Sequence, residues 1–107
     1  MKLYGIKTCD TCRKALKSLT EAGNTVEFVD VRATPLPTER IAQIYAEFGS
    51  DLVNTRSATW RAMDDLARAL PAVEQLCEQP TLMKRPVIES DGALFLGWSK
   101  EVQEALL

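Results

Sequence analysis

The hydrophobic pattern of the first thirty residues changes its period twice. A compact apolar run over residues 2–6 is typical of a buried strand. Asp10 or Thr11 can cap a helix whose apolar residues recur every three or four positions and which ends at Gly23. A second apolar run covers residues 26–31. The pattern therefore predicts a βαβ unit with a right-handed crossover.

The middle of the chain, residues 38–80, has a helical pattern throughout. Thr38 begins a helix that ends at Gly49, and Ser57 caps a second helical stretch. Because Pro71 interrupts that stretch, we expect at least two helices in it.

The last part of the chain returns to the period of strands. Residues 86–88 and 94–96 predict two strands, and the Ser-Asp-Gly sequence at 90–92 predicts the hairpin turn between them. Ser99 then caps a terminal helix.

The order of these elements is βαβ, a helical segment, then ββα. This order is that of an α/β, thioredoxin-like fold, in which a mixed four-stranded sheet is flanked by helices. We therefore predict a single domain over residues 1–107, with a helical insertion at about residues 38–80.

The amino-acid composition excludes several classes of protein. A chain of 107 residues with 46% hydrophobic residues can bury a core without disulfide bonds. The formal charge of −2 argues against direct nucleic-acid binding, which needs a strongly basic face. The chain lacks both an apolar run of about 18 residues, as a membrane span needs, and the apolar core of a signal peptide. Three cysteines, an odd number, fit reduced thiols. We expect a cytoplasmic protein that does not bind membranes.

The absence of histidine restricts the chemistry further. It excludes Cys-His and Ser-His nucleophile pairs and removes the commonest metal ligand. A zinc site at Cys9 and Cys12 would need two more ligands, and Cys77 and carboxylates are what remains. We therefore expect no metal site, and we interpret Cys77 as a core thiol.

The CxxC sequence at Cys9 and Cys12 is the strongest candidate for chemistry. Cys9 lies between the end of a strand and the first turn of a helix, where free N–H groups and the helix dipole favour a thiolate. Lys7 and Arg13 add positive charge nearby, and Asp10 opposes it. Cys12, one turn later, can attack a sulfur bonded to Cys9. This spacing predicts a nucleophile, Cys9, and a resolving thiol, Cys12; the alternative is that both cysteines are packing residues.

Arg85, directly before Pro86, is the second candidate. A cis bond between them would present backbone beside Cys9, and a guanidinium can bind an oxyanion or carboxylate with two hydrogen bonds. The alternative is a solvated surface charge, and Arg56 and Arg61 are similar candidates. The predicted substrate-binding residues are Lys7, Thr8, Asp10, Thr11, Arg56 and Pro86.

Four stretches of the chain resemble the arsenate reductase (ArsC) family. They are KLYGIKTCDTCRKAL, NTRSATWR, LMKRPVIESDG and the final GWSKE, in the order and over the length that the family shows. The likeness is to the small YffB-type members and, through the CxxC, to the Spx-type regulators. The resemblance implies a thioredoxin-like fold with the helical insertion and a cytoplasmic bacterial protein.

The resemblance also implies roles for individual residues. In arsenate reductases of this family a cysteine after the first strand attacks arsenate, and glutathione and glutaredoxin complete the reduction. That cysteine matches Cys9, and the arginine four positions later matches Arg13. The arginine that binds the oxyanion before a proline matches Arg85, with Pro86 after it. No bound cofactor is implied; glutathione is the expected co-substrate, with glutaredoxin or thioredoxin as an alternative reductant.

Two positions depart from the family's pattern. Asn54 stands near the family's middle arginine, with Arg56 as the local substitute, and Gly97 stands at its last arginine, with nothing basic before Lys100. Arsenate would lose much of its positive cradle. We therefore expect a glutathione-dependent thiol reductase, as YffB-like proteins are thought to be, in which Arg56 and Arg85 hold the carboxylates of glutathione.

The resemblance to Spx implies a different class of function. In that case the chain is a redox-sensing regulator that binds the C-terminal domain of the RNA polymerase α subunit. Cys9 and Cys12 then form a disulfide under oxidation and act as a switch without turnover.

Overall fold

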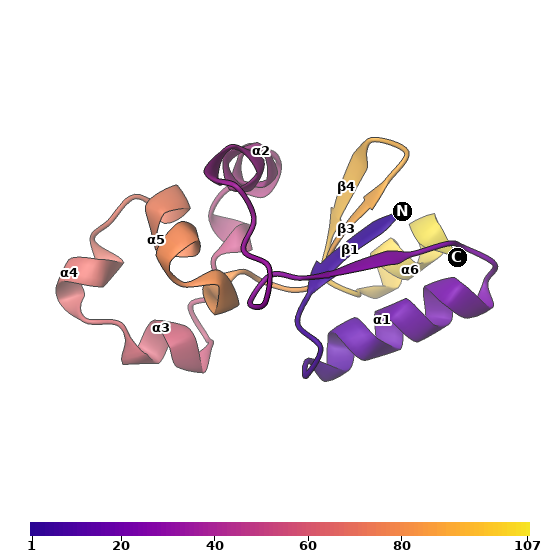
Figure 1. The fold of residues 1–107 in the computed structure, drawn as a ribbon, viewed down its shortest axis with the longest axis horizontal. Coiled ribbons are helices and arrows are strands. Elements are labelled where there is room, and N and C mark those ends of the chain that lie inside the picture. The colour runs from indigo at the N-terminus through magenta and orange to yellow at the C-terminus, as the bar shows by residue number, and fades with distance from the viewer. The chain divides into compact units, whose positions relative to one another are not determined.

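The computed structural model describes residues 1–107, which form two compact units (Figure 1). The sheet unit combines Met1–Val31 with Arg85–Leu107, and the helical unit is Arg32–Lys84. No helix in either unit has the length and apolar character needed to cross a bilayer. The prediction of a single domain over residues 1–107 stays a prediction.

The sheet unit contains one mixed, four-stranded sheet, as predicted. Its strands lie in the order β2-β1-β3-β4, with β1 parallel to β2 and antiparallel to β3, and β3 antiparallel to β4. The elements of this unit are β1 (Lys2–Gly5), α1 (Asp10–Glu21), β2 (Glu27–Asp30), β3 (Val87–Ser90), β4 (Ala93–Leu96) and α6 (Lys100–Leu106). The strand ends differ from the predicted ones by one or two residues.

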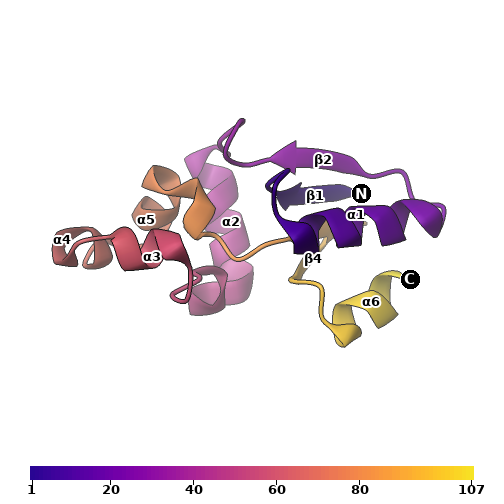
Figure 2. The same cartoon turned by 90° about the horizontal axis from the view of Figure 1, so that it is seen from below.

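The core of this unit lies between one face of the sheet and the helices α1 and α6. Register places Leu3 opposite Phe28 and Ile88, so the three side chains share a face. α1 runs alongside β1 and β2 (Figure 2). The fully buried or nearly buried members of the cluster are Leu3, Cys12, Ala15, Leu19, Ile88 and Val102. The apolar spacing in the sequence is thus the spacing of residues that face the sheet.

Turns and caps of the sheet unit follow the residues that predicted them. Gly23, which follows α1, has φ of +97°. Asp91 and Gly92, with φ of +50° and +81°, form the two-residue hairpin turn between β3 and β4. The Ser99 hydroxyl accepts a hydrogen bond of 3.4 Å from the Val102 N–H and so caps α6.

The helical unit contains four α-helices and two 3₁₀ turns. They are α2 (Thr38–Phe48), a turn at Gly49–Leu52, α3 (Ala58–Ala62), α4 (Asp65–Arg68), α5 (Ala72–Glu78) and a turn at Pro80–Leu82. Ser57 caps α3 by accepting from the Trp60 N–H at 3.1 Å, and Pro71 precedes α5. Three helices after Ser57 satisfy the prediction of at least two. Cys77 is partly exposed, with Sγ 3.6 Å from Thr38 Oγ1, so its interpretation as a core thiol is wrong.

Candidate active site

Cys9 lies at the N-terminus of α1, immediately after the turn that follows β1. Its N–H donates to the Ile6 carbonyl at 3.0 Å, and its carbonyl accepts from the Arg13 N–H at 3.0 Å. The second bond is the first of the helix, and the backbone of Cys9 is still extended. The N-cap residue is therefore Cys9, and the prediction that Asp10 or Thr11 caps the helix is wrong: both already lie in or at its first turn.

The turn before Cys9 is held by a buried carboxylate that the sequence reasoning missed. Asp30 is 9% exposed and ends β2, where it lies opposite Gly5. Its Oδ2 accepts a hydrogen bond of 3.1 Å from the Lys7 N–H. The bond ties the chain between β1 and Cys9 to the end of the neighbouring strand. An acidic residue at the end of an apolar strand was the signal in the sequence.

Gly5 allows α1 to approach β1 closely. A Cβ atom at this position would lie 2.5 Å from Cys12 Sγ and 3.1 Å from its Cβ, closer than packed atoms come. Cys12 is fully buried, and its sulfur occupies the space that a side chain at Gly5 would need. Glycine in a strand interior often marks such an approach. This close approach was not among the predictions from the sequence.

The surroundings of Cys9 lower the pKa of its thiol. Partial burial acts to raise this pKa, but hydrogen bonds from the backbone N–H of Cys12, the thiol of Cys12 and the guanidinium of Arg85, together with the charge of Arg85, outweigh it. The Cys9 side chain does not form a side-chain cap of α1 by hydrogen-bond geometry. The backbone N–H of Cys12 nevertheless favours the Cys9 thiolate. Cys9 is partly exposed, unlike Cys12, which is fully buried.

The pKa of Cys12 moves in the opposite direction. Burial raises it to about 11 from the ordinary 9.0, and the hydrogen bond and negative charge of Cys9 add to the rise. A hydrogen bond from the Ile6 backbone and the charge of Arg85 oppose it. The two thiols of the CxxC are therefore unequal: the accessible one favours the thiolate and the buried one the thiol.

Arg85 reaches Cys9 from the segment that leads into β3. The Arg85–Pro86 peptide bond is cis, and Pro86 is buried. The Pro86 carbonyl accepts from the Gly97 N–H at 2.8 Å. Of the two alternatives for Arg85, a ligand beside Cys9 or a solvated surface charge, the contact with the thiol supports the first.

Arg13 makes a different contact from the one its charge suggested. Its guanidinium pairs with the carboxylate of Asp10 one turn earlier on α1, and both side chains are largely exposed. Thr8 and Thr11 are also exposed at this end of the helix. The structure therefore brings together Cys9, Cys12 and Arg85, with Arg13 paired beside them.

Arg56 belongs to the helical unit. It lines a polar pocket of about 640 Å³ together with Asn54 and Lys84. The Asn54 side chain accepts from the Arg56 N–H at 3.1 Å, so it shapes this turn. Arg61 is used structurally, since its guanidinium donates to the Arg56 carbonyl at 3.0 Å. Arg56 remains a predicted ligand.

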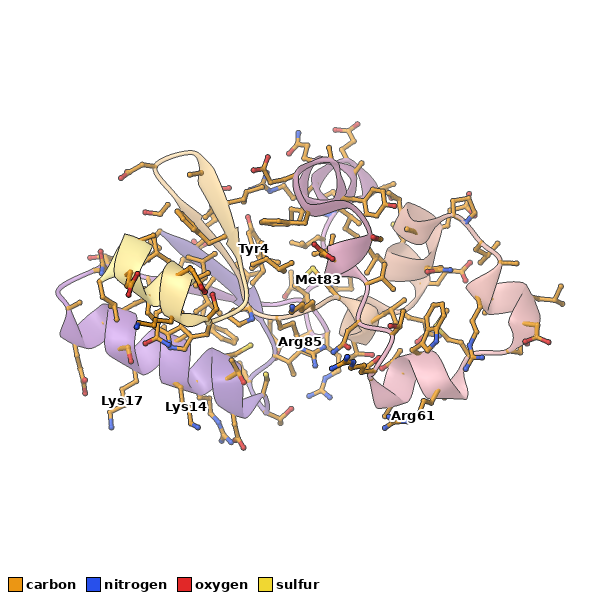
Figure 3. The ribbon with its side chains drawn as sticks, turned by 180° about the vertical axis from the view of Figure 1, so that it is seen from behind. Tyr4, Lys14, Lys17, Arg61, Met83 and Arg85 are labelled. Atoms are coloured by element: carbon orange, nitrogen blue, oxygen red, sulfur yellow. The ribbon has the colours of Figure 1, made fainter.

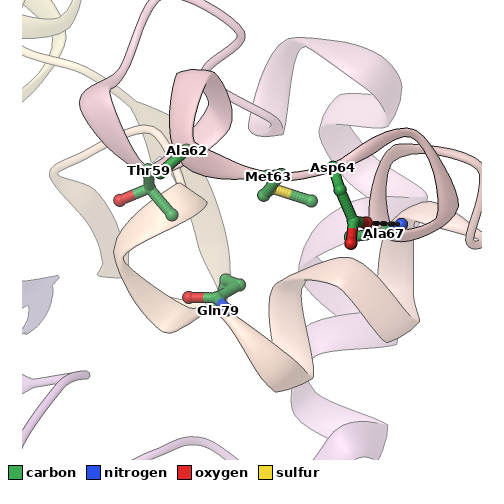
Figure 4. A pocket seen from close by; sticks show the side chains of 6 residues that line it. All are labelled: Thr59, Ala62, Met63, Asp64, Ala67 and Gln79. Atoms are coloured by element: carbon green, nitrogen blue, oxygen red, sulfur yellow. Dashed lines mark hydrogen bonds between the residues drawn. The ribbon is translucent and has the colours of Figure 1, made fainter.

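A second pocket of the helical unit has a volume of about 420 Å³ (Figure 4). Its polar groups serve the fold: Asp64 caps α4 by accepting from the Ala67 N–H at 2.8 Å, and the Thr59 hydroxyl bonds that of Thr81 at 2.7 Å. These bonds leave the pocket without a group suited to catalysis. No three potential metal-ligating residues gather anywhere in residues 1–107.

Comparisons with known proteins agree with the motifs. The ArsC family model matches residues 4–106. A protein of Haemophilus influenzae is 39% identical over 108 residues, which cover 96% of this chain and 95% of that protein. The global transcriptional regulator Spx of Listeria innocua is 30% identical over 106 residues, which cover 92% of this chain and 80% of the regulator. A solved structure of a YFFB protein superposes with a TM-score of 0.90 at 33% identity, over 99% of this chain and 97% of that one. The chain belongs to the ArsC family.

Proposed function

We propose that the protein is a glutathione-dependent thiol reductase, with Cys9 as its nucleophile and Cys12 as its resolving thiol. The observation that carries this proposal is the opposite shift of the two pKa values, lowered at Cys9 and raised at Cys12. A nucleophile must be a thiolate and accessible, whereas a resolving thiol is protected until it is needed.

The reaction begins with a mixed disulfide between glutathione and a second thiol. The Cys9 thiolate attacks the glutathione sulfur, the second thiol leaves as a thiolate and takes up a proton, and a Cys9–glutathione disulfide remains. Cys12 then loses its proton and attacks Cys9, which releases glutathione and forms the Cys9–Cys12 disulfide. Two further glutathione molecules reduce that disulfide and become oxidised glutathione.

The causes of the raised pKa of Cys12 also support this order of the two attacks. Two of the influences that raise the pKa of Cys12 are the hydrogen bond and the negative charge of Cys9. Both depend on a Cys9 thiolate and disappear once Cys9 is bonded to glutathione. The first step therefore makes Cys12 easier to deprotonate. Arg85 remains beside the site and favours both thiolates.

Thiol reduction fits this site better than arsenate reduction. Gly97, at the position of a family arginine, has φ of +81°, where side chains are strained. Asn54 stands near the position of a second family arginine, and its side chain accepts a hydrogen bond from the Arg56 N–H. A disulfide substrate needs fewer cationic ligands than tetrahedral arsenate.

The test is turnover with glutathione and a mixed disulfide, coupled to NADPH and glutathione reductase. We expect Cys9→Ser to abolish turnover and Cys12→Ser to lower it. Cys77→Ser is the matched control and should leave the rate unchanged, because the proposed exchange uses the thiols of Cys9 and Cys12, whereas the Cys77 thiol lies beside Thr38. Turnover that survives in Cys9→Ser would contradict the proposal. Loss of turnover in Cys9→Ser alone would instead indicate a mechanism in which Cys12 is auxiliary.

The proposed role of Arg85 toward glutathione has its own test. If its guanidinium group holds a carboxylate of glutathione, Arg85→Ala should weaken the binding of glutathione. A glutathione titration of Arg85→Ala with unchanged affinity would remove Arg85 from that role.

A second candidate function rests on the Spx relative, which aligns with nearly the whole chain. In that case the Cys9–Cys12 disulfide is a signal, and the partner is the C-terminal domain of the RNA polymerase α subunit. Retention of this domain by the protein, together with no turnover of the mixed disulfide or of arsenate, would favour the regulator. Turnover without retention would favour the enzyme.

A further inference from the structure

We propose that a small hollow beside Cys9 is a specificity subsite for the half of the disulfide substrate that is not glutathione, and that it takes an apolar group carrying a carboxylate. This inference rests on the proposed reductase function and extends it to the class of substrate. The hollow has a volume of about 260 Å³ and is lined by Lys7, Arg13, Leu16 and Phe28.

The hollow lies on segments that adjoin the nucleophile. Lys7 precedes Cys9 by two residues. Arg13 lies one helical turn after Cys9, and its N–H donates a hydrogen bond to the Cys9 carbonyl. Leu16 follows one turn further along α1, and Phe28 comes from β2. A group in the hollow is therefore bound next to the end of α1 at which Cys9 stands.

The floor of the hollow is apolar. Leu16 and Phe28 are both partly buried and pack against the core cluster of the sheet unit, so each presents its remaining surface outward. The surface that lines the hollow is almost entirely apolar, although Lys7 and Arg13 are among the residues that line it. Such a surface gains free energy when it is covered by an apolar group.

The rim supplies one cation that has no partner within the chain. The carboxylate of Asp10 pairs with Arg13, whereas the ammonium group of Lys7 forms no ion pair. The backbone of Lys7 is fixed by its N–H bond to Asp30, so the base of this side chain is held beside the hollow. Lys14 and Lys17 project from α1 into solvent and do not line it (Figure 3). Lys7 is thus the residue placed to pair with an anion bound there.

Size and polarity select the occupant. Pockets for drug-sized ligands measure about 300–1,000 Å³, so this hollow suits a fragment such as one aromatic ring. Glutathione is a polar tripeptide and matches neither the size nor the apolar floor. The half of the disulfide that leaves as a free thiol is the part that the hollow can recognise.

The first experiment compares three glutathione mixed disulfides that differ in one group each. The second thiol is 2-mercapto-3-phenylpropanoate, 2-mercaptopropanoate, which lacks the phenyl ring, or 1-phenylpropane-2-thiol, which lacks the carboxylate. We expect kcat/KM to fall about tenfold without the ring and about threefold without the carboxylate, the usual sizes for a partly enclosed apolar group and an exposed ion pair. Equal kcat/KM for the first two substrates would overturn the proposal.

Variants assign the two effects to residues. Lys7→Gln should remove the advantage of the carboxylate and keep that of the ring, whereas Leu16→Ala should reduce the advantage of the ring. Lys17→Gln is the matched control on α1 and should change neither ratio. An unchanged carboxylate effect in Lys7→Gln would contradict the assignment. This result remains informative if Leu16→Ala fails to fold.

A second experiment does not depend on turnover. Titration of the reduced protein with 3-phenylpropanoate, followed by amide NMR shifts, should move the signals of Leu16 and Phe28. Lys7→Gln should weaken the titration several-fold and Lys17→Gln should not. If none of the disulfides is reduced but 3-phenylpropanoate binds as described, the reductase function fails and the binding site stands. If the disulfides are reduced but these signals do not move, the subsite is wrong and the reductase function stands.

Discussion

Arg85 is the cation that contacts the Cys9 sulfur, although Arg13 is nearer to it in sequence. An opposite charge beside a thiol favours the thiolate, and Arg85 is among the groups that lower the pKa of Cys9. Arg13 pairs with Asp10 instead. The pKa of Cys9 therefore depends on a residue that lies 76 positions away in the chain.

We predict that Arg85→Ala raises the pKa of Cys9. The removed charge favours the thiolate, so its loss shifts the midpoint of Cys9 alkylation to higher pH. The measurement is the rate of iodoacetamide alkylation against pH in a Cys12→Ser, Cys77→Ser background, where one thiol remains. Lys17→Ala should leave the midpoint in place, and an unshifted midpoint in Arg85→Ala would refute the role of this charge.

We predict that Gly97→Arg destabilises the protein and does not create an arsenate reductase. The φ angle of +81° at Gly97 is unfavourable for any side chain, at a cost of about 1–2 kcal/mol. Urea unfolding would measure the loss, and an arsenate reduction assay the activity. Unchanged stability together with arsenate turnover would show that the backbone at this position adapts to the family's arginine.

At the scale of elements, the contact between β1 and α1 determines where the two thiols stand. Gly5 lets the first turn of α1 pack onto the strand, and the buried Cys12 sulfur fills the space above it. The same contact leaves Cys9 at the accessible end of the helix. The burial of Cys12, which raises the pKa of its thiol, thus has a packing origin.

We predict that Gly5→Ala lowers the free energy of unfolding by about 1–3 kcal/mol, because the new methyl group overlaps Cys12 Sγ. Cys12→Ala removes that sulfur, so the double variant should lose less than the sum of the two single variants. Chemical denaturation of the four proteins measures the coupling. If the losses of the two single variants add up in the double variant, the new methyl group is accommodated by a shift of the strand and not by displacement of the helix.

We predict that Asp30→Ala loosens the turn before Cys9. The Lys7 N–H would lose its buried acceptor, at a cost of about 1–3 kcal/mol, and Cys9 would lose its fixed position. Asp30→Asn keeps an acceptor oxygen and should retain most of the stability and of the Cys9 alkylation rate. Thermal unfolding and the alkylation rate test this pair of variants; identical behaviour of both would exclude the hydrogen bond as the cause.

At the scale of the whole molecule, the two pKa shifts make stability depend on pH. The lowered pKa of Cys9 contributes stability that is present above the unfolded value and is lost as the pH falls through the folded pKa. The raised pKa of Cys12 contributes in the opposite sense, because the folded state keeps a proton that the unfolded state releases. The contribution of Cys12 is fully present below the ordinary value of 9.0 and is lost as the pH rises toward about 11.

We predict that the free energy of unfolding falls between pH 9 and pH 11 more steeply in the reduced wild-type protein than in Cys12→Ser. Other groups titrate in this range in both proteins, so the difference between the two curves isolates Cys12. Urea unfolding across this range under reducing conditions makes the measurement. Parallel curves would show that the burial of Cys12 does not hold its proton.

Much of the fold and part of the site were predictable from local pattern. The periods of apolar residues, the glycines at 23 and 49 and the serines at 57 and 99 predicted the elements and several of their ends, because these signals act within a few residues. The CxxC at the start of a helix likewise predicted a nucleophile at Cys9, and the Arg85–Pro86 pair was recognisable as a second feature.

What the tertiary structure decided were the contacts between distant segments. Arg85, and not Arg13, is the partner of the Cys9 thiol. The Asp30 carboxylate accepts the hydrogen bond from the Lys7 N–H, and Cys12 packs against Gly5. The tertiary structure also exposed part of Cys77, which a local apolar pattern had suggested to be core. The physical reason is the same in each case: burial, charge and close packing are set by neighbours in space. By itself, the sequence determined where the two thiols stand along the chain, whereas contacts between distant segments lowered the pKa of Cys9 and buried Cys12.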